Sequence, residues 1–423
     1  MRRYGTTAIG FALSVGLLAV VSLLVIPQMI QSGGAHGWAS VAVGQSIGAV
    51  ATTVIVYGWG ISGPAMVAAV DEATARSRFA ESFIVRLLIS TPVLVIGIPI
   101  MFLAVERDFF LEGYMGYATA AMIGISANWY FVGRRRPYAM LFLDTMPRIG
   151  GLLVGLLIGR SGGSLLSIVA CQYLGVLAGA FLSAASIIRR DDLVHLTSGG
   201  WPLALRLLRE QAAFMWGAFF AVLFAALPIT LVSAISQSSL PAFAIVDKVY
   251  RQVAAGLSPI VNVFQGWVPA TRLEDVKRRS KIAFGVSVTI AISAVAFFAI
   301  FGARVFDILG FELGAPSALF AGLLVGAYLV RSMLQLAILP SFRLRLSGRG
   351  PVLYGGILGL LLVPPLLICA GAMGAMLAGV LGLIAASVGM AKELRKAVSG
   401  GDTSGSSLRV RDAWLESSSS RRV

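Results

Sequence analysis

The segment AIVDKVYRQVAAGLSPIV, residues 244–261, lies in one of the most apolar parts of the chain, yet it carries Asp247, Lys248 and Arg251. A charged side chain at the centre of a bilayer costs about 2.5–3.5 kcal/mol on insertion scales. Asp247 and Arg251 are four residues apart, so they can pair on a helix and offset part of that cost. Lys248 then remains as an excess cation that could hold an anionic group.

Further polar residues follow the same helical face. At about 100° per residue, one narrow stripe contains Asp247, Arg251, Ser258, Asn262 and Gln265, with Lys248 and Gln252 on its flank. Such a stripe should face a wet cavity or another helix, because lipid cannot satisfy it. Two interpretations stay open: an ion pair that locks two helices together, and a ligand-facing surface. The excess lysine and the length of the stripe favour the ligand-facing surface.

A second buried cation is expected in FAGLLVGAYLVRSMLQLAILP, where Arg331 lies near the middle of an apolar run. Tyr328 and Gln335 fall on the same helical face, three and four residues away. Arg331 has no carboxylate in its own run. It must pair with Asp247 across a cavity or with a ligand, and the sequence does not decide between the two.

A further charged pair, Asp144 and Arg148, lies in LFLDTMPRIGG near the expected cytoplasmic end of its helix. The favoured interpretation is a capping ion pair at the membrane interface. The alternative is a cytoplasmic mouth where Arg148 meets a phosphate. Asp247 and Asp144 are the candidate carboxylates for coupling to protons or sodium. Cations still outnumber carboxylates, so a cavity lined by these residues would suit an anionic or diphosphate-bearing substrate.

Long apolar runs must position these residues. The chain is 57% hydrophobic and 13% charged, whereas soluble proteins have about 25% charged residues. Runs of about 20 apolar residues can each cross a bilayer as a helix. The sequence therefore predicts an all-α polytopic membrane protein with twelve spans near 7–29, 38–60, 85–104, 111–132, 138–159, 163–187, 211–233, 239–268, 281–302, 316–340, 351–371 and 373–392.

The distribution of basic residues predicts the orientation. With a cytoplasmic N-terminus, 28 of the 34 Lys and Arg residues lie on the cytoplasmic side, 3 lie outside and 3 lie within spans. This asymmetry favours twelve spans with both ends in the cytoplasm. It also accounts for the net charge of +15 without a nucleic-acid partner. Two cysteines in apolar spans and two histidines in predicted loops indicate neither a disulfide nor a metal site, and no cofactor is expected.

The longest cytoplasmic connection lies at the midpoint of the chain and divides it into two sets of six spans. Such halves are typical of secondary transporters that hold substrate between them. We predict an N-terminal lobe at 1–190, a connection at 191–210, a C-terminal lobe at 211–398 and a disordered Gly/Ser-rich cytoplasmic tail at 399–423. The aromatic run Trp129–Phe131, followed by three arginines, is predicted to be an interfacial belt.

Several stretches resemble one family of membrane proteins. GGAHGWASVAVGQSI after the first span, VYGWG, ANWYFVG and DKVYRQVAAGLSPIVNVFQGWVP are similar to segments of bacterial polysaccharide-repeat flippases. These O-antigen and exopolysaccharide flippases share a superfamily with multidrug and toxic-compound extrusion transporters and lipid II flippases. The resemblance covers about residues 5–395, and each stretch is loose, but their order matches.

The resemblance implies two six-helix lobes around a V-shaped central cavity, in a multi-pass protein of the bacterial inner membrane. It implies alternating access that carries polyprenyl-diphosphate-linked oligosaccharides to the outer leaflet, with cavity cations holding the diphosphate. Its Asp-Lys stretch falls on Asp247, Lys248 and Arg251. A polysaccharide polymerase and chain-length or export proteins are the implied partners, besides membrane lipids.

Two alternatives remain. An ion-coupled multidrug exporter of the same fold would want exposed carboxylates in its cavity, whereas the expected surplus here is cationic. An integral-membrane glycan enzyme would need a large external loop, and the longest external connection, near 303–315, has about a dozen residues. No Walker, HExxH or GxSxG motif is present. The sequence therefore favours a transporter over an enzyme.

Overall fold

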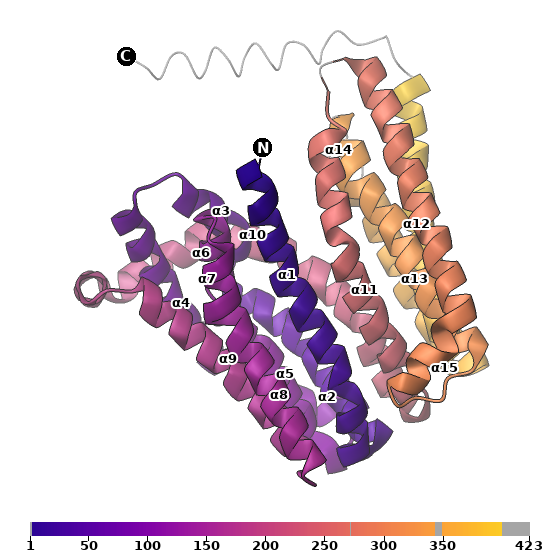
Figure 1. Cartoon of the computed structure of the whole chain (residues 1–423), viewed down its shortest axis with the longest axis horizontal. Helices are drawn as coiled ribbons and strands as arrows, with labels where there is room; N and C mark the ends of the chain where they lie inside the picture. Colours follow the sequence, from indigo (N-terminus) through magenta and orange to yellow (C-terminus); the bar gives the residue numbers. More distant parts are fainter. Residues whose placement is uncertain (1, 271, 343–348, 400–423) are drawn as a thin grey trace.

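The structure, a computed structural model, describes residues 2–270, 272–342 and 349–399, and every regular element in them is helical. The predicted all-α membrane protein is confirmed at this level. Figure 1 shows two groups of helices that diverge toward the end carrying the N-terminus and α14 and approach each other at the opposite end. The charge distribution predicts that the diverging end is cytoplasmic.

The N-terminal group contains the first nine α-helices and three short turns of 3₁₀ or π helix. They are α1 (Arg2–Leu24), α2 (Ile26–Val56), α3 (Trp59–Ala68), α4 (Glu72–Ala104), η1 (Arg107–Phe109), α5 (Phe110–Met122), η2 (Ile123–Ile125), α6 (Asn128–Gly133), α7 (Pro137–Met140), η3 (Leu141–Thr145), α8 (Met146–Arg160) and α9 (Leu165–Ile187).

The remaining elements lead into and form the C-terminal group. They are α10 (Arg190–Ile235), η4 (Gln237–Ser239), α11 (Leu240–Trp267), α12 (Leu273–Ile308), α13 (Ala315–Ser332), η5 (Met333–Ile338), α14 (Leu339–Ser341) and α15 (Arg349–Ser399).

Every predicted span falls on helical segments. By length and composition, seven helices among the described residues can cross a membrane, and two shorter apolar helices lie at Leu13–Leu24 and Val222–Ile235. The last of the seven, within α15, has non-helical backbone at Ala370 and Gly371, where the sequence separates two spans. The count of twelve and the cytoplasmic termini stay predictions.

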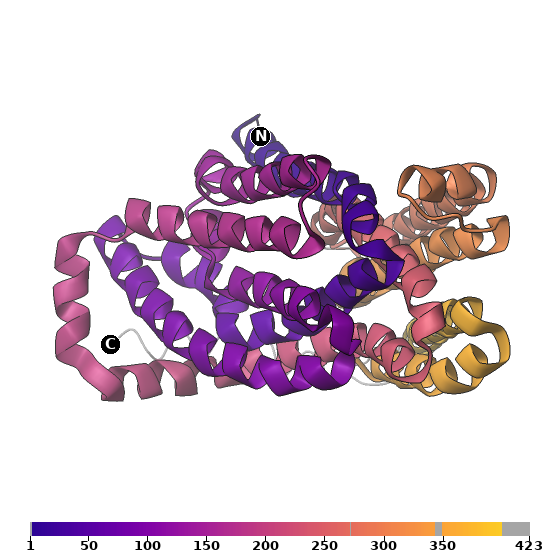
Figure 2. The same ribbon diagram turned by 90° about the horizontal axis from the view of Figure 1, so that it is seen from below.

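The connection predicted at 191–210 is helical. It belongs to α10, which runs without interruption to Ile235 and packs against α2, α4 and α15. Figure 2 shows its first part at the far edge of the N-terminal group and its later part directed toward the C-terminal group. The boundaries at 190, 210 and 398 stay predictions, and 400–423 lie outside the described residues.

Small residues bring α2 and α5 into close contact. A Cβ atom on Gly48 would lie 2.8 Å from the Ala120 Cβ atom, and one on Gly116 would lie 2.7 Å from the Val41 carbonyl oxygen. Contacts this short are available only to glycine, so they fix the rotation of α2 about its axis. The opposite face of α2 is thereby directed toward the C-terminal group.

The aromatic run at 129–131 is not an interfacial belt. Trp129, Tyr130 and Phe131 are only 4%, 0% and 2% exposed. The reason is the close packing of α6 on α3, where a Cβ atom on Gly63 would lie 2.8 Å from Cδ2 of Trp129. The Tyr130 hydroxyl donates a hydrogen bond to Glu72 at 3.1 Å.

Beside this contact, Asp71 caps α4 by accepting hydrogen bonds from the backbone N–H groups of Ala73 and Thr74. Hydrogen bonds from Thr74 hold the pKa of Asp71 below its ordinary value. Arg134 pairs with Glu72 at 2.6 Å and also donates to the Val67 carbonyl. The predicted cytoplasmic end of the N-terminal group is therefore tied together by polar contacts.

Candidate functional site

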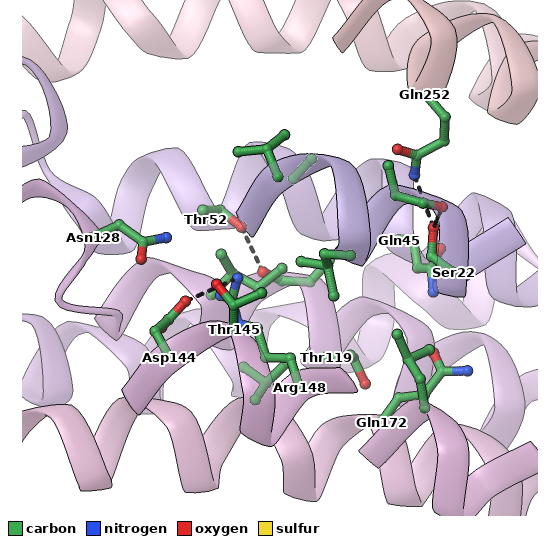
Figure 3. A pocket seen from close by; sticks show the side chains of 18 of the residues that line it. Ser22, Gln45, Thr52, Thr119, Asn128, Asp144, Thr145, Arg148, Gln172 and Gln252 are labelled. Atoms are coloured by element: carbon green, nitrogen blue, oxygen red, sulfur yellow. Dashed lines mark hydrogen bonds and ion pairs between the residues drawn. The ribbon is translucent and has the colours of Figure 1, made fainter. Parts of the chain in front are cut away.

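A cavity of about 610 Å³ lies between the inner faces of the N-terminal group and α11 (Figure 3). Its charged lining residues are Asp144, Arg148 and Lys248. Its neutral polar lining residues are Ser14, Ser22, Gln45, Thr52, Thr53, Thr119, Asn128, Thr145, Gln172 and Gln252. Apolar residues from several helices, among them α1, α8 and α9, complete the wall, so the cavity offers many hydrogen-bonding groups on an apolar frame.

The Asp144–Arg148 pair belongs to this cavity. Arg148 Nη1 lies 3.4 Å from Asp144 Oδ2, and the two side chains are 8% and 1% exposed. The sequence predicts the pair near the cytoplasmic end of its helix, as a capping ion pair or, in the alternative, with Arg148 at a cytoplasmic mouth. The structure places it well inside the helix that runs from Pro137 to Arg160, and Figure 3 shows both side chains in the cavity wall.

Local backbone geometry explains this placement. Asp144 lies in the π-helical turn η3, a feature that often marks functional sites. Gly179 of α9 packs directly on this turn, because a Cβ atom there would lie 2.7 Å from the Asp144 carbonyl oxygen. Arg148 Nε and Nη2 are buried and have no hydrogen-bond partner among the described residues. Two donors of Arg148 are therefore available for a bound group.

Lys248 and Gln252 bring α11 into the same cavity. Lys248 Nζ donates to Gln45 Oε1 of α2 at 2.8 Å, and Gln252 Nε2 donates to Ser22 Oγ of α1 at 3.2 Å. Both side chains come from the flank of the predicted stripe. This flank, and not the centre of the stripe, faces the N-terminal group.

The centre of the stripe turns elsewhere. Arg251 Nε pairs with Asp247 Oδ2 at 2.6 Å, and Arg251 Nη2 donates to the Ala225 carbonyl of α10 at 2.5 Å. Neither residue lines the cavity. In this conformation Asp247 and Arg251 join α11 to α10, which agrees with the ion-pair interpretation left open by the sequence.

Arg331 lies on another face of the C-terminal group. Its guanidinium sits 5.2 Å from the centre of the Tyr328 ring, and Tyr328 meets Tyr250 of α11 edge to face at 5.8 Å. Its Nε atom is buried without a hydrogen-bond partner, and no ion pair is found for it among the described residues. Arg331 does not line the cavity that holds Lys248, so the structure does not bring these two cations together.

Among the described residues, the other amide side chains predicted to bind substrate are not found in the cavity wall. Gln265 and Gln335 are half-buried and do not line the cavity, and Gln335 lies in the π-helical segment η5. The side chain of Asn262 lies outside the described residues. No group of three His, Cys, Asp or Glu side chains that could hold a metal ion occurs among the described residues.

Sequence reasoning missed Arg86 and Gln45. Arg86 is 0% exposed and donates to the carbonyl oxygens of Gly124 and Ser126 at 3.0 and 2.8 Å. Arg86 lies near the start of the apolar run at 85–104, so the sequence groups it with the cytoplasmic basic residues, among which Arg148 is also counted. One feature of the sequence could have indicated Gln45 as a site residue: it is a polar amide next to Gly44 inside an apolar span.

No protein-family model matches the sequence, and no curated protein matches it. Solved structures do. One is an inward-facing multidrug resistance MATE family transporter of the MOP superfamily, with 15% identity and a TM-score of 0.55 over 93% of this chain and 98% of that chain. Another is a MOP superfamily transporter from Pyrococcus furiosus Vc1, with 13% identity and a TM-score of 0.42 over 94% and 96%. The first shows that the chain shares the fold of a MATE transporter.

Proposed function

We propose that the chain is an alternating-access transporter that carries polyprenyl-diphosphate-linked oligosaccharides from the cytoplasmic to the outer leaflet of a bacterial inner membrane. The fold of a MATE transporter and the two diverging helix groups support the transport mechanism. The resemblance to polysaccharide-repeat flippases supports the cargo. A polysaccharide polymerase and export proteins would then use the delivered units.

The lining of the cavity carries this proposal. Arg148 and Lys248 outnumber the single lining carboxylate, Asp144, and ten neutral polar side chains surround them. Guanidinium and ammonium groups bind phosphate oxygens through charge-assisted hydrogen bonds. The hydroxyls and amides can bind the hydroxyl groups of sugars. A diphosphate bearing an oligosaccharide needs both kinds of contact.

The exposed surface of α1 also suits a cargo that stays anchored in the membrane by a lipid tail. Large apolar side chains are exposed along α1, including Leu13, Val20 and Leu24 at 48%, 56% and 59%. These side chains would face acyl chains, while Ser14 and Ser22 of the same helix line the cavity. A lipid-linked sugar could keep its tail in the bilayer while its polar head crosses in the cavity.

One observation favours a second candidate, an ion-coupled exporter of multiple drugs. Asp144 is a 1% exposed carboxylate in the cavity wall, and the similar structure is that of a multidrug resistance transporter. A buried carboxylate can exchange a proton or a cation during transport. Cationic drugs would nevertheless meet Lys248 and Arg148 in the same space.

Transport by the purified protein in liposomes separates the two. We expect it to move a fluorescent polyprenyl-diphosphate oligosaccharide between leaflets, measured by the fraction of fluorophore that an impermeant quencher reaches. The same glycolipid with a neutral linkage in place of the diphosphate is the matched control and should move slowly. Uptake of tetraphenylphosphonium without movement of the diphosphate lipid would overturn the proposal in favour of drug export.

A further inference from the structure

Gln45 is held at a fixed place on the inner face of α2. Its neighbour Gly44 and the next-turn residue Gly48 pack directly on α5, and a Cβ atom on Gly44 would lie 2.9 Å from the Tyr117 backbone nitrogen. This close packing directs Gln45 away from α5. Its side chain lines the cavity, and Figure 3 shows it beside Ser22 and Gln252.

The partner of Gln45 belongs to the other helix group. The Gln45 Oε1 atom accepts the hydrogen bond from Lys248 Nζ at 2.8 Å, across 203 residues of sequence. Asp247, the carboxylate adjacent to Lys248 in the chain, is paired with Arg251 instead. The cation that α11 contributes to the cavity is therefore bound by a neutral amide.

A neutral amide oxygen is a weaker acceptor for an ammonium group than an anionic oxygen is, because only the anionic oxygen adds the attraction between opposite charges, which is large in a region of low dielectric constant. An anionic group that enters the cavity can thus displace Gln45 from Lys248.

We propose that Gln45 occupies the place of an anionic cargo oxygen on Lys248, so that binding of a diphosphate head breaks a hydrogen bond that joins the two helix groups. This inference rests on the proposed function and assigns Gln45 as its specificity-determining residue. The Ser22–Gln252 hydrogen bond and the contact of Trp38 with Phe311, at 5.4 Å between ring centres, also join the groups. Loss of the Lys248 link would leave fewer contacts to hold them in this conformation.

The test is calorimetric binding of farnesyl diphosphate to the purified full-length protein in micelles, with farnesol as the neutral probe. Gln45→Ala removes the competitor, and we expect it to bind the diphosphate about tenfold more tightly, equivalent to about 1.4 kcal/mol. Gln45→Glu replaces the amide by a carboxylate, and we expect binding at least about tenfold weaker. Gln31→Ala, a change to an exposed residue of the same helix, is the matched control and should behave as wild type.

The opposite signs at position 45 are decisive, because general destabilisation would weaken binding in both variants. Equal diphosphate affinity for Gln45→Ala and Gln31→Ala would overturn the inference. If the Gln45 inference failed in this way but Lys248→Ala no longer bound farnesyl diphosphate, the proposed function would still stand. If the wild-type protein bound farnesol as tightly as farnesyl diphosphate, both the inference and the proposed cargo would be refuted.

Discussion

The buried cations of the two helix groups differ in their partners. In the N-terminal group, Arg148 is paired with Asp144, and Arg86 is bound by the carbonyl oxygens of Gly124 and Ser126 at the end of η2. In the C-terminal group, Lys248 is held by a neutral amide and Arg331 rests on an aromatic ring. The N-terminal group therefore pairs its buried cations with a carboxylate or with carbonyl oxygens, although two donors of Arg148 stay without a partner, whereas the C-terminal group keeps two cations with neutral partners.

This difference separates two roles for a buried charge. A compensated cation contributes mainly to holding the helices in place, and its removal exposes the partner to an apolar surrounding. A weakly bound cation retains attraction for an arriving anion in a region of low dielectric constant. We expect mutations in the N-terminal group to lower stability, and mutations in the C-terminal group to lower transport at unchanged stability.

The largest effect is expected for Asp144→Leu, which leaves Arg148 buried without its carboxylate. Breaking a buried ion pair in this way costs about 3–5 kcal/mol. The free energy of unfolding, measured by denaturation in mixed micelles, should fall by that amount. The double change Asp144→Leu with Arg148→Met removes both charges and should recover most of the loss. Equal instability of the single and double variants would contradict a compensating role for the pair.

An intermediate effect is expected for Lys248→Ala. A hydrogen bond to a charged group contributes about 1.5–3 kcal/mol, so the affinity for a diphosphate lipid should fall about ten- to hundredfold. Polysaccharide export in cells should decrease while the amount of membrane-inserted protein stays constant. Immunoblotting of membranes beside the export assay checks both.

Arg331→Ala provides the companion measurement, because Arg331 lies outside the cavity in this conformation. We expect reduced export here too, as rearrangement of the two groups brings other faces of α13 to the cargo. Arg331→Lys keeps the charge but loses the planar fork that binds phosphate. Full export by the double variant Lys248→Ala with Arg331→Ala would end the case for a C-terminal cation site.

Much of the fold could be predicted because each membrane span has to be an apolar run of sufficient length. The non-helical backbone at Ala370 and Gly371 of α15 lies where the sequence separates two apolar runs. The partners of individual side chains are harder to predict from the sequence. The sequence spacing of Asp247 and Arg251 predicted their ion pair, which the structure contains, but spacing cannot tell which neighbouring helix the pair will face.

The counting of basic residues failed at Arg86 and Arg148 for a related reason. Arg86 lies at the start of the predicted span 85–104, where cytoplasmic charges are common, and Arg148 lies near the middle of 138–159 but is counted with the basic residues before that span. Their burial depends on glycine contacts between helices, such as Gly179 against η3, which no single run reveals. Packing between helices therefore decides which basic residues are buried, and the pattern of apolar residues along the sequence does not contain this information.

The smallest effect is expected where the two groups touch. Phe311→Leu keeps an apolar side chain against Trp38 but removes an edge-to-face contact that contributes about 0.5–1.5 kcal/mol. The equilibrium between conformations should move about two- to twelvefold toward the state in which the outer ends of the two helix groups are separated. Spin labels at exposed positions 108 and 315, with Cys171 and Cys369 replaced by serine, would report this as a larger share of long distances.

Phe284→Leu is the matched control, because Phe284 is 42% exposed on α12 and has no ring contact with Trp38. It should leave the distance distribution unchanged. A distribution that stays unchanged in Phe311→Leu as well would mean that polar links, including Gln45 with Lys248, hold the groups together without help from the aromatic pair. The division between a compensated N-terminal group and a cargo-responsive C-terminal group would then depend on the cavity hydrogen bonds alone.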